Sequence, residues 1–339
     1  MRLMTSPKTT GMPSRAKKKP KKPRKLLRLF LMLMLIAGLG IAGFAGYTYF
    51  KLNGLLDEVA ADDKEGNVVV PKEDLAEVKP KTILLLGLDS RKETHTMLTD
   101  VIMVITMNPQ TKSATVVSIP RDTRMEVTGF NRVSKANSYY AAFHNKNDYS
   151  DPVEANMKSF FGQYLDVPID YVSVVNFNGF KDVINAVGGI DVNVDMDMRY
   201  VDTADGTDID LKKGQQELNG DEALDYVRYR KSNKGTGASS DLERNQRQQE
   251  VIHQLLNKIK SVEGVVKVGG IFDAVGNNIE TDIPSQQLTS FIKTYMGINN
   301  DNIEYVPLEG TWRSPYIRID EEQLEAAKSK LKARLGQSE

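Results

Sequence analysis

Three apolar runs follow one another closely in the first half of the chain. They cover residues 83–88 (ILLLGL), 101–107 (VIMVITM) and 114–119 (ATVVSI). Each run has the length of a β-strand and is apolar almost throughout, as is typical of strands that are buried on both faces. Such a sheet needs helices to cover it. The runs therefore predict an α/β fold with a mixed central sheet flanked by helices on both faces.

The rest of the chain alternates between helical and strand-like patterns. Asn219 with Glu222 three residues later is typical of a helix N-cap with its capping partner, and it predicts a helix that carries Arg228. Apolar residues recur at helical spacing from Asp241 to Ile259, which predicts one long amphipathic helix. The other predicted helices cover residues 134–143, 152–164, 178–187, 285–296 and 321–335, and the other predicted strands cover 171–176, 190–194, 303–306 and 316–319.

An uncharged apolar segment, residues 29–50, precedes all of these elements. Its 22 residues suffice for a helix to cross a bilayer, and they exceed the apolar run of a cleaved signal peptide, which is the alternative. The preceding residues 1–28 are basic, so we expect a cytoplasmic tail, a single-pass anchor in the cell membrane and an extracellular remainder. Residues 51–81 are interpreted as a juxtamembrane linker, and residues 82–339 as the folded catalytic domain.

The charge of the chain is divided unevenly. The first 28 residues hold eleven of the 45 Lys and Arg and no acid, which leaves 34 basic residues against 45 acidic ones in the remainder. The basic tail has no interleaved aromatic residues and adjoins the apolar segment, which favours contact with anionic lipid over nucleic acid. The chain has no cysteine, which excludes disulfides. Its three histidines lack metal-ligand spacing, which argues against a zinc site.

Arginines are concentrated between residues 218 and 248, in LNGDEALDYVRYR and DLERNQRQ. Arginine offers a fixed fork of donors that matches phosphate, so several together indicate a multiply charged phosphate ligand such as pyrophosphate. The alternative is a set of exposed helix arginines paired with nearby acids. Arg244 and Gln248 share one face of the predicted long helix, whereas Arg247 would only flank them. Arg228 and Arg230 can both point inward only if the preceding helix ends near Val227.

Acidic residues lie near the ends of the first two predicted strands. Asp89 follows the first strand, Asp100 opens the second, and Arg121 follows the third in the sequence SIPRDT. Because ligands of α/β proteins collect at strand ends, Asp89 and Asp100 could together hold a divalent cation, Mg²⁺ or Mn²⁺, with phosphate oxygens. For each acid alone, a turn or cap role is the alternative. Acids, cation and arginine at one edge would suit phosphoryl transfer.

These motifs, in this order, resemble the LytR-CpsA-Psr (LCP) family of Gram-positive cell-envelope proteins. The resemblance covers about residues 82–335. It rests on GLDSR (87–91), TDVIMVITMNPQTK (99–112), SIPRDT (118–123), K-x-N (135–137), FNGFKDVINAVGGIDVNV (177–194), LNGDEALDYVRYR (218–230) and DLERNQRQ (241–248).

The resemblance implies an enzyme that moves an anionic glycopolymer, of the wall teichoic acid or capsular polysaccharide class, from a polyprenyl-pyrophosphate carrier to peptidoglycan. It implies metal-associated acids at Asp89 and Asp100, and a catalytic role for Asp89 with two arginines. Leu98 departs from the pattern, since many members have an arginine there. A pyrophosphatase that uses the same site, or a non-enzymatic wall-binding or regulatory protein, is the alternative. The implied pyrophosphate-binding residues are Arg121, Arg228, Arg230, Arg244 and Gln248, with Arg91 and Lys135 as weaker candidates, and the implied catalytic residues are Asp89, Arg121 and Arg244.

Overall fold

The computed structural model describes residues 69–91, 96–145, 148–203, 206–260, 278–295 and 297–337. The predicted tail, the predicted anchor and the predicted linker up to residue 68 lie outside these residues. Among the helices that the structure describes, none has the length and apolarity required to cross a membrane.

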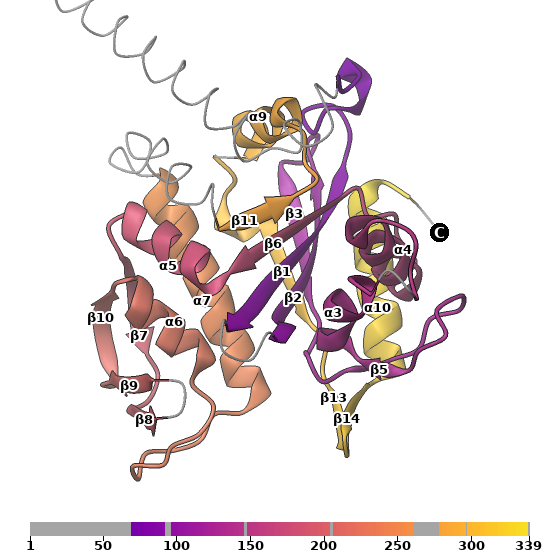
Figure 1. Ribbon diagram of the computed structural model, residues 1–339. Helices are drawn as coiled ribbons and strands as arrows, with labels where there is room; N and C mark the ends of the chain where they lie inside the picture. The colour runs from indigo at the N-terminus through magenta and orange to yellow at the C-terminus, as the bar shows by residue number, and fades with distance from the viewer. Residues whose placement is uncertain are drawn as a thin grey trace, which may run out of the picture. The chain divides into compact units, whose positions relative to one another are not determined.

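The central sheet has six strands in the order β11-β6-β1-β2-β3-β12 (Figure 1). β1 pairs parallel with β6 and antiparallel with β2, and β3 pairs antiparallel with β2 and parallel with β12. The sheet is therefore mixed, as the sequence predicts. Its strands are β1 (Lys81–Arg91), β2 (Thr96–Asn108), β3 (Ser113–Ser118), β6 (Tyr171–Asn176), β11 (Ile279–Thr281) and β12 (Ile303–Pro307).

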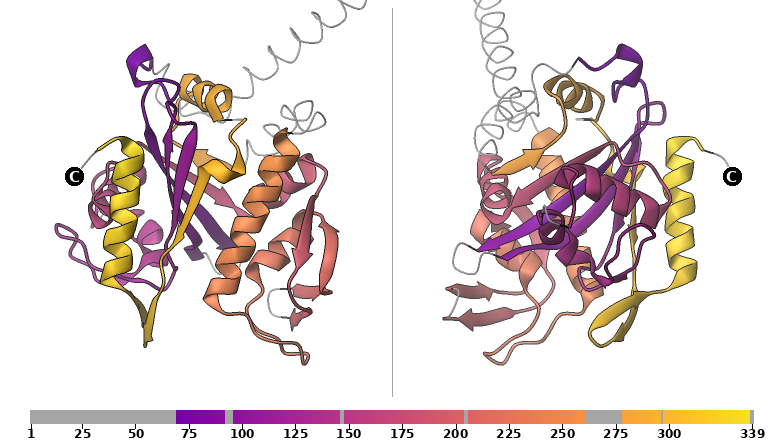
Figure 2. Two further views of the ribbon diagram at one scale, coloured as in Figure 1. Left: turned by 180° about the vertical axis from the view of Figure 1, so that it is seen from behind. Right: turned by 45° about the vertical axis from the view of Figure 1, so that its right-hand side comes forward.

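Helices lie on both faces of this sheet, and Figure 2 shows α10 (Glu321–Leu335) and α7 (Asp241–Lys260) on opposite sides of it. Leu84, Leu86 and Leu88 point to one face and join the larger apolar core. That core is closed by α3 (Tyr139–Phe143), α4 (Val153–Leu165) and α10. The other face of β1 turns toward α5 (Phe177–Ala186), and α7 packs on β12.

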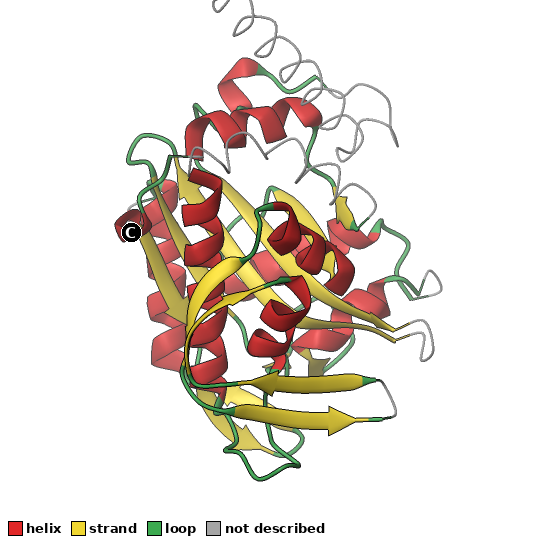
Figure 3. Ribbon diagram, turned by 90° about the vertical axis from the view of Figure 1, so that its left-hand side faces the viewer, coloured by secondary structure: helices red, strands yellow, loops and turns green. Residues whose placement is uncertain are grey.

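A second apolar core lies among α5, α6 (Gly220–Arg228), α7 and two small sheets that face the viewer in Figure 3. Asn219 caps α6 as predicted, since its side chain accepts hydrogen bonds from the N–H groups of Asp221 and Glu222, and its own backbone N–H donates to Glu222 Oε2. The two sheets pair β7 (Ile190–Val194) with β10 (Gly214–Leu218) and β8 (Met198–Asp202) with β9 (Thr207–Leu211).

Short elements complete the described chain. A hairpin of β13 (Gly310–Arg313) and β14 (Tyr316–Ile319) precedes α10. The predicted helix over residues 134–143 begins only at Tyr139, because the backbone of residues 134–135 pairs with residues 124–125. The remaining elements are β4 (Arg124–Met125), β5 (Ser134–Lys135), η1 (Lys72–Asp74), η2 (Ala136–Ser138), η3 (Asn300–Asn302) and α9 (Ser285–Tyr295).

The sequence predicts a linker that extends to residue 81, but the folded region already begins before residue 82. The backbone N–H of Val70 donates to Gln286 Oε1 over 3.1 Å, and that of Ala76 donates to Gln287 Oε1 over 3.3 Å. Leu75 and Ala76 are buried. The C-terminal part of the predicted linker is thus fixed to α9 by contacts between residues that are more than 200 positions apart in sequence. Local sequence patterns do not reveal contacts of this kind.

Candidate active site

A cavity of about 550 Å³ lies between the central sheet and the helices α5, α6 and α7. Along the cavity wall, the lining side chains of both β1 and α7 change from charged or polar to apolar. In β1 the lining residues run from Asp89 back to Leu85, and in α7 they run from Arg244 to Leu255, a rise of roughly 16 Å at 1.5 Å per residue. The cavity therefore has a charged end and an apolar end.

Both predicted metal-binding acids lie on the charged wall, and Asp100 does so because β2 contains a bulge. Gly87 is opposite Val101 and Leu88 is opposite Thr99, so Asp100 is an extra residue in β2. A bulge of this kind turns two successive side chains to one face. Asp100 therefore lines the cavity with Asp89 and Val101. The prediction that Asp100 opens the second strand is wrong, since β2 begins at Thr96.

Arg121 meets Asp100 at this wall. Its Nη1 donates to Asp100 Oδ1 over 2.7 Å, and its Nε lies 3.5 Å from Asp122 Oδ2. Burial acts to lower the pKa of Arg121, but the charges and hydrogen bonds of the two carboxylates outweigh burial and raise it. Arg121 therefore stays a cation in a half-buried position, beside an acid that the sequence assigns to a metal.

Arg228 and Arg230 both line the cavity because α6 ends at Arg228, close to where the sequence requires it to end. Tyr229 leaves the helical conformation, with φ −56° and ψ 122°, and its buried side chain belongs to the second core. The Arg228 guanidinium lies 4.7 Å from the ring centroid of Phe177, a cation–π contact that fixes its position on the wall.

Seven of the candidate site residues thus line one cavity, although they come from β1, β2, the loop after β3, the end of α6 and the start of α7. They are Asp89, Asp100, Arg121, Arg228, Arg230, Arg244 and Gln248.

The two weaker candidates are not placed there. Lys135 does not line the cavity; its Nζ donates to Asp122 Oδ1 over 2.7 Å. The side chain of Arg91 lies outside the described residues, although its backbone is part of β1.

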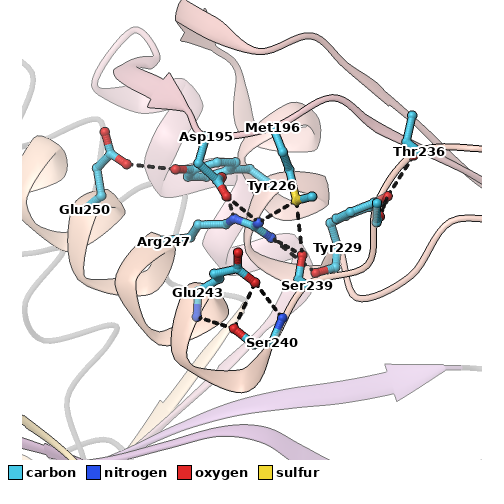
Figure 4. A network of polar contacts seen from close by, with 11 residues as sticks. Asp195, Met196, Tyr226, Tyr229, Thr236, Ser239, Ser240, Glu243, Arg247 and Glu250 are labelled. Carbon is cyan, nitrogen blue, oxygen red and sulfur yellow. Dashed lines mark hydrogen bonds and ion pairs between the residues drawn. The ribbon is translucent and has the colours of Figure 1, made fainter.

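Arg247 has a structural position, which corrects the expectation that it only flanks the site. Its side chain is 2% exposed, and its Nε and Nη2 donate to the two carboxylate oxygens of Asp195 over 2.8 and 2.7 Å (Figure 4). Its Nη1 donates to Ser239 Oγ over 2.8 Å and to the Tyr229 carbonyl over 3.3 Å. Arg247 therefore ties α7 to the segment that carries Arg230.

Sequence reasoning gave no role to several residues that shape the site. Burial acts to raise the pKa of Asp122, but a hydrogen bond from Lys135 and the charges of Arg121, Lys135 and Arg230 hold it below its usual range. Asp122 therefore orients two cations, and its place directly after Arg121 in SIPRDT was the sequence signal that could have identified it.

The β8–β9 hairpin contributes Tyr200, Asp202 and Thr207 to the cavity. The alternating polar pattern of the hairpin gave no sign of this role in the sequence.

The chain matches known proteins over most of its length. The model of the LytR_cpsA_psr family matches residues 46–333. Polyisoprenyl-teichoic acid--peptidoglycan teichoic acid transferase TagV of Bacillus subtilis is 32% identical over 269 residues, which are 78% of this chain and 66% of TagV. The transferase TagU of Bacillus mycoides, of the same description, is 33% identical over 85% of this chain and 90% of its own length.

Solved structures show the same fold. The crystal structure of B. subtilis TagV superimposes with a TM-score of 0.61 and 30% identity, over 77% of this chain and 99% of that one. A structure of TagT bound to LI-WTA gives a TM-score of 0.59 and 27% identity, over 82% of this chain and 98% of that one. Because the family model covers most of the sequence and the fold agrees, the chain belongs to the LytR-CpsA-Psr family.

Proposed function

We propose that this chain transfers a glycopolymer of the teichoic acid class from a polyprenyl-pyrophosphate carrier to peptidoglycan. The observation that carries the proposal is a single cavity with arginines and acids at one end and apolar walls at the other. The relatives described above, which are named teichoic acid transferases, support it over most of the chain.

Each end of the cavity suits one part of such a carrier. The guanidinium groups of Arg121, Arg228, Arg230 and Arg244 would bind the pyrophosphate oxygens, and Gln248 would donate an additional hydrogen bond. The polyprenyl chain would lie along the apolar walls, which include residues of α5 and α7. A volume of about 550 Å³ is typical of a site that encloses a ligand.

The reaction is a phosphoryl transfer in which the arginines neutralise charge. A hydroxyl oxygen of the acceptor sugar forms a bond to the phosphorus nearest the glycan, and the bond from that phosphorus to the bridging oxygen breaks. Polyprenyl phosphate leaves with the bridging oxygen, and the hydroxyl proton passes to a base, for which Asp89 is a candidate. Fixed cationic donors lower the barrier because negative charge accumulates on the oxygens in the transition state.

Magnesium is part of the proposal, and the donor set fits it. Asp89 and Asp100 present carboxylates to the same cavity, while the residues described by the structure contain no cluster of three or more His, Cys, Asp or Glu that would form a complete metal cage. Magnesium is usually bound by one or two carboxylates together with substrate phosphates and water. When bound, the ion would neutralise phosphate charge beside the arginines.

We further propose that the domain acts outside the cell membrane, with the N-terminus in the cytoplasm. The support is the basic tail of residues 1–28 followed by the apolar segment 29–50. That arrangement would tether the domain to the membrane in which a polyprenyl carrier resides.

The proposed function is tested by incubating the full-length chain with a synthetic lipid-pyrophosphate-linked glycan, magnesium and peptidoglycan fragments. We expect a new phosphodiester between glycan and fragment, identified by mass, and release of polyprenyl phosphate that depends on the acceptor. Release of polyprenyl phosphate without acceptor would instead show a pyrophosphatase. Binding of glycopolymer without any bond cleavage would show a wall-binding protein.

Replacing Asp89 or Asp100 by alanine should abolish magnesium-dependent turnover, because each would remove one of the two carboxylates proposed to hold the ion. The measurement is turnover as a function of magnesium concentration, with melting temperature as a check on folding. Asp202→Ala is the matched control, since Asp202 lines the same cavity from β8. If the Asp100→Ala protein kept an unchanged magnesium dependence, the assignment of the metal to this pair would be wrong.

A further inference from the structure

Trp312 lies on the β13–β14 hairpin, which projects beyond the central sheet (Figure 1). It is the only tryptophan in the chain and is 54% exposed. A single exposed apolar residue is common on protein surfaces and by itself indicates nothing. The surroundings of Trp312, however, connect it to the candidate active site.

The hairpin is fixed to the loop that carries Arg121. The backbone N–H of Ile317 donates to the Asp122 carbonyl over 2.8 Å, and Ile317 forms a bridge with Thr123. Trp312 is directly opposite Ile317 in the hairpin, so both side chains lie on the same face. Ile317 is buried and lines a small pocket of about 30 Å³ together with Arg121. Trp312 is therefore on the face of the hairpin that is turned toward the site.

Lys135 holds the indole ring. Its Nζ lies 5.7 Å from the ring centroid of Trp312 and donates to Asp122 Oδ1 over 2.7 Å. A cation over the face of an indole is attracted by the ring, so this contact orients the ring as well as the lysine. Trp312 remains 54% exposed beside this lysine, so a large part of its surface can contact a ligand.

The small pocket adjoins the charged end of the large cavity. It shares five lining residues with the large cavity, but it lacks the apolar parts of α5 and α7. The shared residues are Asp100, Val101, Arg121, Arg244 and Gln248, and the other lining residues are Ile102, Ser118, Ile119, Pro120, Asp122, Asn245 and Ile317. In phosphoryl transfer the attacking and leaving oxygens are roughly in line on opposite sides of the phosphorus. If the leaving polyprenyl phosphate occupies the large cavity, the acceptor hydroxyl approaches from the side of the small pocket.

We propose that Trp312 is a stacking platform for a sugar ring of the acceptor glycan strand, held by Lys135 beside the entrance to the small pocket. The inference rests on the proposed function, of which it names the acceptor subsite. A pyranose ring has a flat face of C–H groups that packs on an indole ring, while its hydroxyls remain in water. A lipid surface is the other ligand that exposed tryptophan suits. Trp312, however, is linked to the small pocket through Lys135, which contacts both the indole ring and Asp122, and through the hairpin contact of Ile317 with Asp122.

The test uses the fluorescence of the full-length chain in detergent, in which Trp312 is the sole emitter of its kind. We expect oligosaccharide fragments of peptidoglycan to shift the emission saturably to shorter wavelength. In the transfer assay, Trp312→Ala should raise the KM for the acceptor on the order of tenfold or more, with the KM for the lipid donor and the kcat unchanged. Trp312→Phe should restore most of the acceptor affinity. Arg318→Ala, on the opposite face of the hairpin, is the matched control.

Two results would overturn the proposal. One is transfer by Trp312→Ala with an unchanged KM for the acceptor. The other is an emission wavelength that does not change with the glycan fragments and shifts only when the protein is moved into anionic lipid vesicles. Such a shift would indicate a membrane contact. Because the fluorescence titration needs no turnover, it still tests the subsite if the transfer reaction itself is not found. In that case the proposed function fails, while binding at Trp312 is decided separately.

Discussion

Replacing Arg247 by alanine is expected to lower the free energy of unfolding by about 3 kcal/mol, as for the loss of one partner of a largely buried ion pair. Arg247 is 2% exposed, whereas the side chain of Asp195 is 39% exposed, so we expect the lower part of the range for such pairs. The variant also loses the hydrogen bonds to Ser239 and to the Tyr229 carbonyl. Thermal unfolding should move down by roughly 10 °C, measured by circular dichroism or calorimetry.

The pH dependence offers an independent check on Arg247. Burial acts to raise the pKa of Asp195, but the hydrogen bond and charge of Arg247 lower it below the usual range. The stabilisation from a lowered carboxyl pKa is complete above the unfolded value of about 4 and is lost as the pH falls through the folded value. Stability of the wild type should therefore fall in acid by more than that of Arg247→Ala. Equal melting temperatures at neutral pH would contradict the structural role.

Local signals in the sequence were enough for most helices and strands. Asn219 and Glu222 predicted the start of α6, and both residues act there as a capping pair. The strict 3.6-residue period predicted α7 from Asp241, and continuous apolar runs predicted β1, β2 and β3. These features depend on residues that are near one another in sequence, which is why a single sequence reveals them.

Features set by distant contacts were not predictable. The bulge at Asp100 follows from the register of β2 against β1, and the sequence around it reads as an ordinary strand start. Arg244 and Arg247 are three residues apart in one motif, yet one lines the cavity and the other is buried against Asp195. Helical spacing separates Arg244 from Arg247, but the burial of Arg247 depends on Asp195 in the loop after β7, which lies 52 residues earlier in the chain.

Replacing Arg121 or Arg244 by alanine is expected to cut turnover on the order of a hundredfold or more. Each would remove a preorganised cationic donor from the charged end of the cavity, and a well-placed donor contributes on the order of 2.7 to 4 kcal/mol to transition-state stabilisation. The measurement is kcat and kcat/KM for a defined lipid-pyrophosphate substrate. The melting temperature should change less in Arg244→Ala than in Arg247→Ala, because Arg244 is not part of the buried pair with Asp195.

The pair Arg244→Ala and Arg247→Ala separates the two roles on a single helix. Arg244→Ala should lose activity and keep its stability, whereas Arg247→Ala should lose stability first, with activity falling as the fold does. Lysine at Arg228 or Arg230 should restore only part of the rate, since it keeps the charge but lacks the two-donor fork that matches a phosphate. Small and equal losses of turnover at all four cavity arginines, with unchanged stability, would contradict a site built for phosphoryl transfer. Such a result would favour a surface that binds an anionic polymer without chemistry, because on such a surface the binding charge is shared among many residues.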